Sequence, residues 1–154
     1  MVLFTIIGGE IAPGIEMSSS ETILDLKEKI QEVLDIEVHR QSLWYNNMEL
    51  RDTEFIDACG FHRDATVILR VTSLPQHVKL HVLVKHIGSN GYVRVKETDM
   101  VHDLRRKVEK YWGIPLEFFT LYRLNIEMMD NHPLYAYYIN EASEVKLCVS
   151  IEPR

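Results

Sequence analysis

The stretch TILDLKEKIQ, residues 22–31, predicts an amphipathic helix, and the rest of the fold follows from its surroundings. Thr22 followed by Asp25 has the pattern of a capping box, which marks the beginning of a helix. Apolar residues return at spacings of three and four and share one stripe: Ile23, Leu26, Ile30 and Leu34. The polar residues between them are expected to face water: Asp25, Lys27, Glu28, Lys29 and Glu32.

Runs of β-forming residues lie on both sides of this helix in the sequence. MVLFTII and IAPGIEM precede it and meet at Gly8 and Gly9, which suit a tight hairpin. QSLWYNN and TVILRV follow it. The order is strand, strand, helix, strand, strand, and one helix laid across a small mixed sheet buries both apolar faces. The sequence therefore predicts an α+β domain.

The same order recurs in the second half of the chain. Its expected strands are KLHVLVKH, YVRVKE, FTLYRL and EVKLCVSI, and its expected helix is VHDLRRKVEKYW. From the helix onward the halves match without a gap, as Asp25 with Asp103 and Leu43 with Leu121 illustrate. The chain is thus an internal duplication. We expect a first domain at residues 1–73, a short semi-rigid linker at 74–78 around the proline of TSLPQH, and a second domain at 79–154.

Composition and charge limit the classes of function. No apolar run reaches the roughly 18–20 residues that span a bilayer, and the first residues lack the positively charged start of a secretory signal peptide. We therefore expect an intracellular protein of the cytoplasm or nucleus. Residues 1–74 hold 6 basic and 13 acidic side chains, whereas residues 75–154 hold 11 and 10. This asymmetry argues against a uniform nucleic-acid binder and suggests two units with different surfaces.

Candidate catalytic and metal-binding residues are scattered. Among the seven histidines only His77 and His81 have i, i+4 spacing, and they lie in the expected linker and an expected strand and not on a helix, so no metal or cofactor is expected. Cys59 and Cys148 are interpreted as free thiols without a neighbouring base, and we expect no enzyme. The run RRKVEK places Arg105, Arg106, Lys107 and Lys110 on the second helix, either as a solvated face or as a site for an acidic partner.

The first repeat resembles ubiquitin. TILDLKEKIQ, LWYNNMELRD and TVILRV stand where ubiquitin has its helix, its third and fourth strands and its last strand. The second repeat is similar to another ubiquitin-like domain, and it keeps the GIP that follows the family's helix, as Gly113, Ile114 and Pro115. The resemblance covers nearly the whole chain. It implies two tandem ubiquitin-like β-grasp domains.

The departures from ubiquitin bear on conjugation. Conjugated relatives end in Gly-Gly, whereas this sequence ends in VSIEPR and the first repeat runs into VTSLPQH. Met48 and Arg63 stand where ubiquitin has two of its main chain-linking lysines. The resemblance therefore implies a protein that is not conjugatable as written. The alternative is a covalent ubiquitin-like modifier whose mature tail is missing or altered, which the intact mass of the endogenous protein would reveal.

The resemblance also locates a binding surface, since readers of ubiquitin grip the open face of its sheet. Strand alternation points Trp44, Ile68 and Arg70 outwards in the first repeat, with Arg40 at the rim. The corresponding candidates in the second repeat are Phe118, Tyr122, Lys146 and Cys148. Trp44 either binds a partner or packs against the neighbouring domain or the linker around Leu74.

These observations predict a non-enzymatic interaction module or adaptor in ubiquitin- or proteasome-related pathways. The expected partners are other proteins, such as ubiquitin-fold readers, ligases or proteasome components. Neither nucleic acid nor membrane is expected as a partner.

Overall fold

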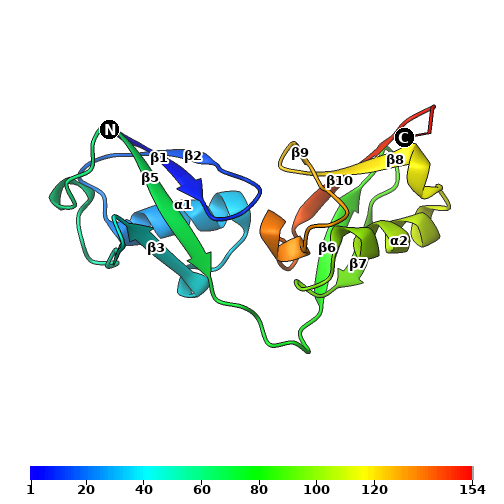
Figure 1. Cartoon of the computed structure of the whole chain (residues 1–154), viewed down its shortest axis with the longest axis horizontal. Helices are drawn as coiled ribbons and strands as arrows, with labels where there is room; N and C mark the ends of the chain where they lie inside the picture. The colour runs from blue at the N-terminus through cyan, green and yellow to red at the C-terminus, as the bar shows by residue number, and fades with distance from the viewer. Residues whose placement is uncertain (154) are drawn as a thin grey trace. The chain divides into compact units, whose positions relative to one another are not determined.

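The chain forms two compact units, Met1–Ser73 and the residues from Leu74 on (Figure 1). The computed structural model describes residues 1–153, so that only Arg154, the last residue of the predicted second domain, lies outside the described part. Within residues 1–153 each unit holds one α-helix and one mixed five-stranded sheet. The fold class predicted from the sequence, α+β with two β-grasp domains, is confirmed.

The first unit has the sheet order β2-β1-β5-β3-β4. β1 and β5 are parallel at its centre, and the other neighbours are antiparallel. The helix α1 packs across one face, as Figure 1 shows, and leaves the other face open. The elements are β1 (Val2–Ile7), β2 (Gly14–Met17), α1 (Ile23–Leu34), β3 (Gln41–Tyr45), β4 (Met48–Glu49) and β5 (Asp64–Val71).

The second unit repeats this topology with the order β7-β6-β10-β8-β9, and β6 and β10 are its parallel pair. Its helix α2 starts at Val101, and the sequence duplication matches Val101 to Ile23, the first residue of α1. The elements are β6 (Leu80–Lys85), β7 (Gly91–Val95), α2 (Val101–Trp112), β8 (Phe119–Arg123), β9 (Ile126–Glu127) and β10 (Glu144–Val149). The short strand β4 lies within LWYNNMELRD, where the resemblance implied a fourth strand. Its counterpart β9 was not among the expected strands, because two residues are too few to show a period.

The predicted helix of residues 22–31 is confirmed and extends to Leu34. Its capping box is present, since Thr22 Oγ1 accepts from Asp25 N at 3.2 Å and Thr22 N donates to Asp25 Oδ2 at 2.9 Å. The apolar stripe is fully buried against the sheet. The helix ends at Asp35, which takes the left-handed conformation with φ 65°.

One expectation about the helices is wrong. Lys27 does not face water but is buried, and its Nζ lies 2.6 Å from Asp52 Oδ1. Arg105, at the matching position of α2, is also mostly covered. It forms a salt bridge with Asp130 at 2.9 Å and donates to the carbonyl oxygens of Leu116 and Phe119. Each unit thus ties its helix to the loop after its short strand with the same duplicated ion pair.

The segment expected as a linker, residues 74–78, belongs to the second unit in the structure. Leu74 N donates to Glu97 Oε1 at 2.6 Å, and Val78 N donates to Pro75 O at 3.0 Å. The first bond joins the segment to the second unit, and the other closes a turn within it.

Candidate protein-binding surfaces

The open face of the first unit carries an apolar row that crosses three strands. In β5 the buried residues alternate with exposed Thr66, Ile68 and Arg70, as strand periodicity requires. The register places Ile7 of β1 and Trp44 of β3 on either side of Ile68. Directly paired side chains in a sheet lie close enough to touch. Ile7, Ile68 and Trp44 therefore form one continuous strip.

The indole of Trp44 is held in one orientation. Its Nε1 donates to Ser42 Oγ at 2.7 Å, and Ser42 Oγ donates to Glu49 Oε2 at 3.1 Å. The guanidinium carbon of Arg70 lies 4.4 Å from the centre of the indole ring, a cation–π arrangement. A partner that covers this strip therefore meets an aromatic side chain that is already ordered. We call Ile7, Ile68, Trp44 and Arg70 the first open face.

Arg40 does not belong to this surface. Its side chain is buried, with Nε donating to Thr72 O at 2.9 Å and Nη1 lying 3.3 Å from Glu37 Oε2. Arg40 ends a 3₁₀ turn, Val38–Arg40, so the strand alternation that begins at Gln41 does not govern its direction. It fixes the chain at the end of β5 instead of facing a partner.

The second unit brings together three of its four predicted site residues. Lys146 is paired with Tyr122 across β10 and β8, and Cys148 follows on the same face. The three line a shallow depression of about 690 Å³. Phe118 lies outside that depression, half-buried at the end of the 3₁₀ turn Leu116–Phe118.

Two turn residues complete this depression and were missed by sequence reasoning. Ile87, in the turn after β6, is 95% exposed, and Leu124, in the turn after β8, has φ 48°. We call Tyr122, Lys146, Cys148, Ile87 and Leu124 the second open face. Strand alternation gives no information about turn residues, which explains both omissions. Ile7 was also missed, although the alternation of MVLFTII places it on the outer side of β1 and could have identified it.

Cys59 does not have the surroundings of a catalytic nucleophile. Cys59 Sγ donates to Phe55 O at 3.3 Å and to Glu54 Oε2 at 3.6 Å. Burial, together with the carboxylates of Glu54 and Asp57, raises the pKa of the Cys59 thiol to about 11. The thiol therefore stays protonated at neutral pH.

No three His, Cys, Asp or Glu side chains among residues 1–153 are placed to hold a metal ion. Over the same residues, neither helix has the length and apolar character needed to cross a membrane.

Comparison with known proteins found a matching family model and similar solved structures. The ubiquitin family model matches residues 12–74. The solution structure of a ubiquitin-like domain from an Arabidopsis thaliana protein is 31% identical, with a TM-score of 0.46, and the match covers 49% of this chain and 82% of that one. A second structure of the same plant protein is also 31% identical, with a TM-score of 0.45, and the match covers 49% of this chain and 92% of the other.

The two units are tandem ubiquitin-like domains, since the ubiquitin family model matches the first and the second repeats its sheet topology. Folds of this class are generally non-catalytic.

Proposed function

We propose that this chain is a non-enzymatic interaction module, an adaptor that binds other proteins through its two open sheet faces. The observation that carries the proposal is the in-register strip of Ile7, Ile68 and Trp44, capped by Arg70. Its partners would be readers of ubiquitin folds, such as ligase or proteasome components, in the cytoplasm or nucleus.

The composition of the first open face suits a binding site. A Trp side chain buries about 150–250 Å² at an interface, which at about 25 cal/mol/Å² supplies several kcal/mol before the costs of association. Trp and Arg are also enriched among the residues that dominate binding energies. Because Ser42 and Arg70 already hold the indole, its rotamer entropy is largely lost before a partner arrives.

Two such faces on one chain strengthen binding to a partner that can reach both. The second contact becomes intramolecular once the first has formed, and weak individual affinities then combine into a higher avidity. The second open face offers a different chemistry, since it combines aliphatic turn residues with Tyr122 and the cation of Lys146.

The proposal is tested by capture from a cell lysate with the wild-type chain and with a Trp44→Ala/Tyr122→Ala variant, followed by quantitative mass spectrometry. The matched control is Phe55→Ala/Tyr135→Ala, which removes two exposed aromatic rings that lie outside both open faces. Proteins lost from the first variant and kept by the control would support the proposal. Identical lists for all three chains would contradict it.

An identified partner permits a sharper measurement. Trp44→Ala should weaken its binding by about 1–2 kcal/mol or more, while Trp44→Phe, which keeps an aromatic ring, should lose less. Calorimetric titration gives both values, and equal affinities for the wild type and Trp44→Ala would assign the first open face no role in binding.

A further inference from the structure

A basic groove lies in the second unit, at the free edge of its sheet between β7 and α2. It has a volume of about 420 Å³ and is lined by Tyr92, Val93, Arg94, Lys107, Lys110 and Tyr111. Strand β7 ends the sheet order, so no further strand among the described residues pairs with this edge. The groove shares no lining residue with the second open face.

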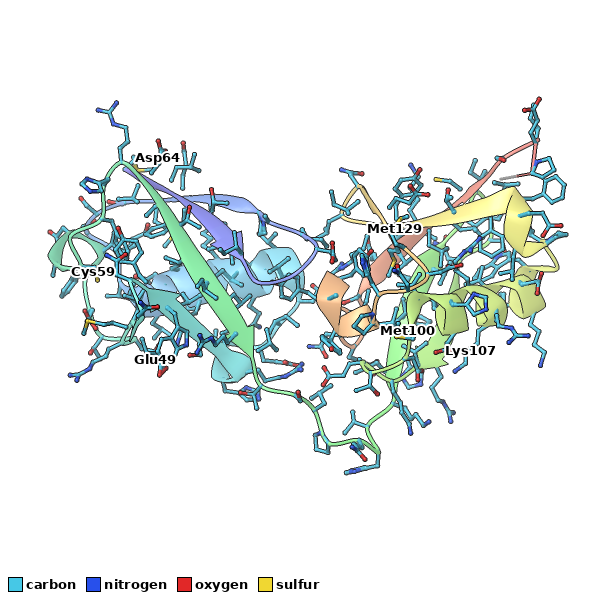
Figure 2. The ribbon with its side chains drawn as sticks, in the orientation of Figure 1. Glu49, Cys59, Asp64, Met100, Lys107 and Met129 are labelled. Atoms are coloured by element: carbon cyan, nitrogen blue, oxygen red, sulfur yellow. The ribbon has the colours of Figure 1, made fainter. Side chains whose placement is uncertain are left out.

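The cations of the groove are available to a ligand. Arg94, Lys107 and Lys110 are exposed, and within residues 1–153 none of them lies in an ion pair. Lys107, labelled on α2 in Figure 2, donates from Nζ to Arg94 O at 2.6 Å, which fixes the ammonium beside the strand edge. By contrast, Lys85 and Arg105 of the same unit are paired with Glu144 and Asp130.

The acidic residues of α2 are occupied at the ends of the helix. Asp103 Oδ2 accepts from Met100 N at 2.9 Å, and Glu109 Oε2 accepts from Leu116 N at 3.0 Å. These bonds hold both carboxylates against the backbone, and among the described residues neither carboxylate forms an ion pair with Lys107 or Lys110.

Two tyrosines provide apolar walls beside these charges. Tyr92 is 59% exposed and Tyr111 is 58% exposed. The ring of Tyr111 lies against the backbone of Gly91, where an added Cβ would come within 2.8 Å of the ring, so glycine is needed for this position of the tyrosine. A ligand with negative charge next to an aromatic or aliphatic side chain would fit both features.

The duplication shows that the fold does not require this charge. In the first unit, Glu16 occupies the β2 position that Arg94 occupies in β7, since Leu3 pairs with Glu16 and His81 pairs with Arg94. On the helices, Glu28 and Glu32 stand where α2 has Arg106 and Lys110. Of the three groove cations, only Lys107 keeps its sign in the first unit, as Lys29. The same surface is therefore acidic in one unit and basic in the other.

We propose that the basic groove binds a short acidic segment of a partner polypeptide, whose carboxylates meet the three cations and whose neighbouring apolar side chain packs on the two tyrosines. A polypeptide fits better than a nucleic acid. Nucleic-acid binding draws its affinity from many phosphate contacts, whereas this groove is short and the chain has a net charge of −6. The inference concerns a surface separate from the open faces and does not depend on their function.

The test is selection from a displayed library of random short peptides with the full chain, followed by titration of the enriched peptides. We expect peptides rich in Asp and Glu with adjacent Tyr, Phe or Leu. An Arg94→Glu/Lys110→Glu variant should weaken their binding about tenfold or more, because reversed charges in an interface repel the ligand. Added salt should weaken binding to the wild type as well.

The matched control is Arg63→Glu/Lys79→Glu, which changes the net charge of the chain by the same amount at two exposed cations outside the groove. This control should bind the peptides with nearly wild-type affinity. Equal losses of peptide affinity in both variants would show that only the net charge of the chain matters, and would overturn the proposal. So would enriched peptides without acidic residues.

Two further measurements keep the test decisive if a variant folds poorly. Titration of the wild-type chain should shift amide resonances of β7 and α2, whereas shifts confined to the open faces would contradict the groove assignment. A single-stranded oligonucleotide that binds the same residues more tightly than the peptides would reassign the groove to nucleic acid, and salt-sensitive self-association in sedimentation would reassign it to a second copy of this chain.

Discussion

Leu124 is in a backbone conformation that its side chain disfavours. It has φ 48° and is followed by Asn125 with φ 66°, as expected for the two central residues of a primed hairpin turn between β8 and β9. In the first unit the same two positions are Asn46 and Asn47, with φ 50° and 64°. Asparagine accepts the left-handed region more readily than leucine, so the second unit has exchanged a favourable turn residue for an exposed apolar one.

The Leu124→Asn variant should therefore stabilise the second unit by about 1 kcal/mol, because it removes the left-handed penalty. The reverse change at the matched position, Asn46→Leu, should destabilise the first unit by a similar amount. Amide hydrogen exchange in β10 and β5 of the full chain measures the two effects separately. Faster exchange in β10 of Leu124→Asn would show that the leucine contributes more through packing than it costs in strain.

Cys59 gives a second prediction about a single residue, the reactivity of its thiol. With a pKa of about 11, the folded protein holds only a small thiolate fraction at neutral pH, and that fraction grows about tenfold for each pH unit until the pKa is approached. In a Cys148→Ser background, alkylation by iodoacetamide should accelerate from pH 7 upwards without a plateau before the protein reaches strongly alkaline pH. A plateau near the ordinary cysteine pKa would contradict the protected environment formed by Glu54 and Asp57.

At the scale of elements, the duplicated ion pair links each helix to a loop distant in sequence. Polarity patterning placed Lys27 on the water-facing side and offered a solvated face for Arg105, whereas the structure buries Lys27 and covers most of Arg105. A long side chain can cover its aliphatic stem while its charge meets a carboxylate, and the sequence between Lys27 and Asp52 gives no local sign of that contact. The apolar stripe and the capping box, which depend on neighbours within one or two turns, were predicted correctly.

Loss of the buried cation should be costly. Lys27→Ala leaves Asp52 without its partner and a gap beneath α1, so we expect a loss of about 1–3 kcal/mol in the stability of the first unit, moderated because Asp52 is half-exposed and can be hydrated. Lys29→Ala is the control, since Lys29 forms only a surface pair with Glu32 and should change stability by about 0.5 kcal/mol or less. Urea unfolding followed by the NMR signals of α1 gives both values, and equal effects would refute a structural role for the pair.

At the scale of the whole molecule, each unit has its own sheet, helix and core. The order of elements and the internal duplication follow from short-range patterns repeated along the chain, so the fold class was accessible from sequence. The parallel pairing of β1 with β5 and of β6 with β10 joins distant segments, and the sequence indicated only a mixed sheet. The residues of the candidate binding surfaces were harder to predict from the sequence. Trp44, Ile68 and Tyr122 follow strand alternation, but Arg40 lies in a 3₁₀ turn and Ile87 in a loop, where no period applies. The groove between β7 and α2 requires two elements to be placed side by side.

Because each core is self-contained, residues 1–73 and 74–154 expressed separately should each fold. We expect dispersed NMR spectra and one cooperative unfolding transition for each fragment. A fragment that stays unfolded alone and folds when its partner fragment is added would show that the two units depend on each other for stability.

The two tryptophans of the chain fall one to each unit, with Trp44 on the first open face and Trp112 at the end of α2, where its Nε1 donates to Ser89. The protein therefore carries a natural optical label in each unit. Covering the first open face would change the polarity around Trp44 and disturb its stacking with Arg70, and so shift the emission of that indole. Trp112 would serve as an internal reference in the same spectrum, without any dye attached to the chain.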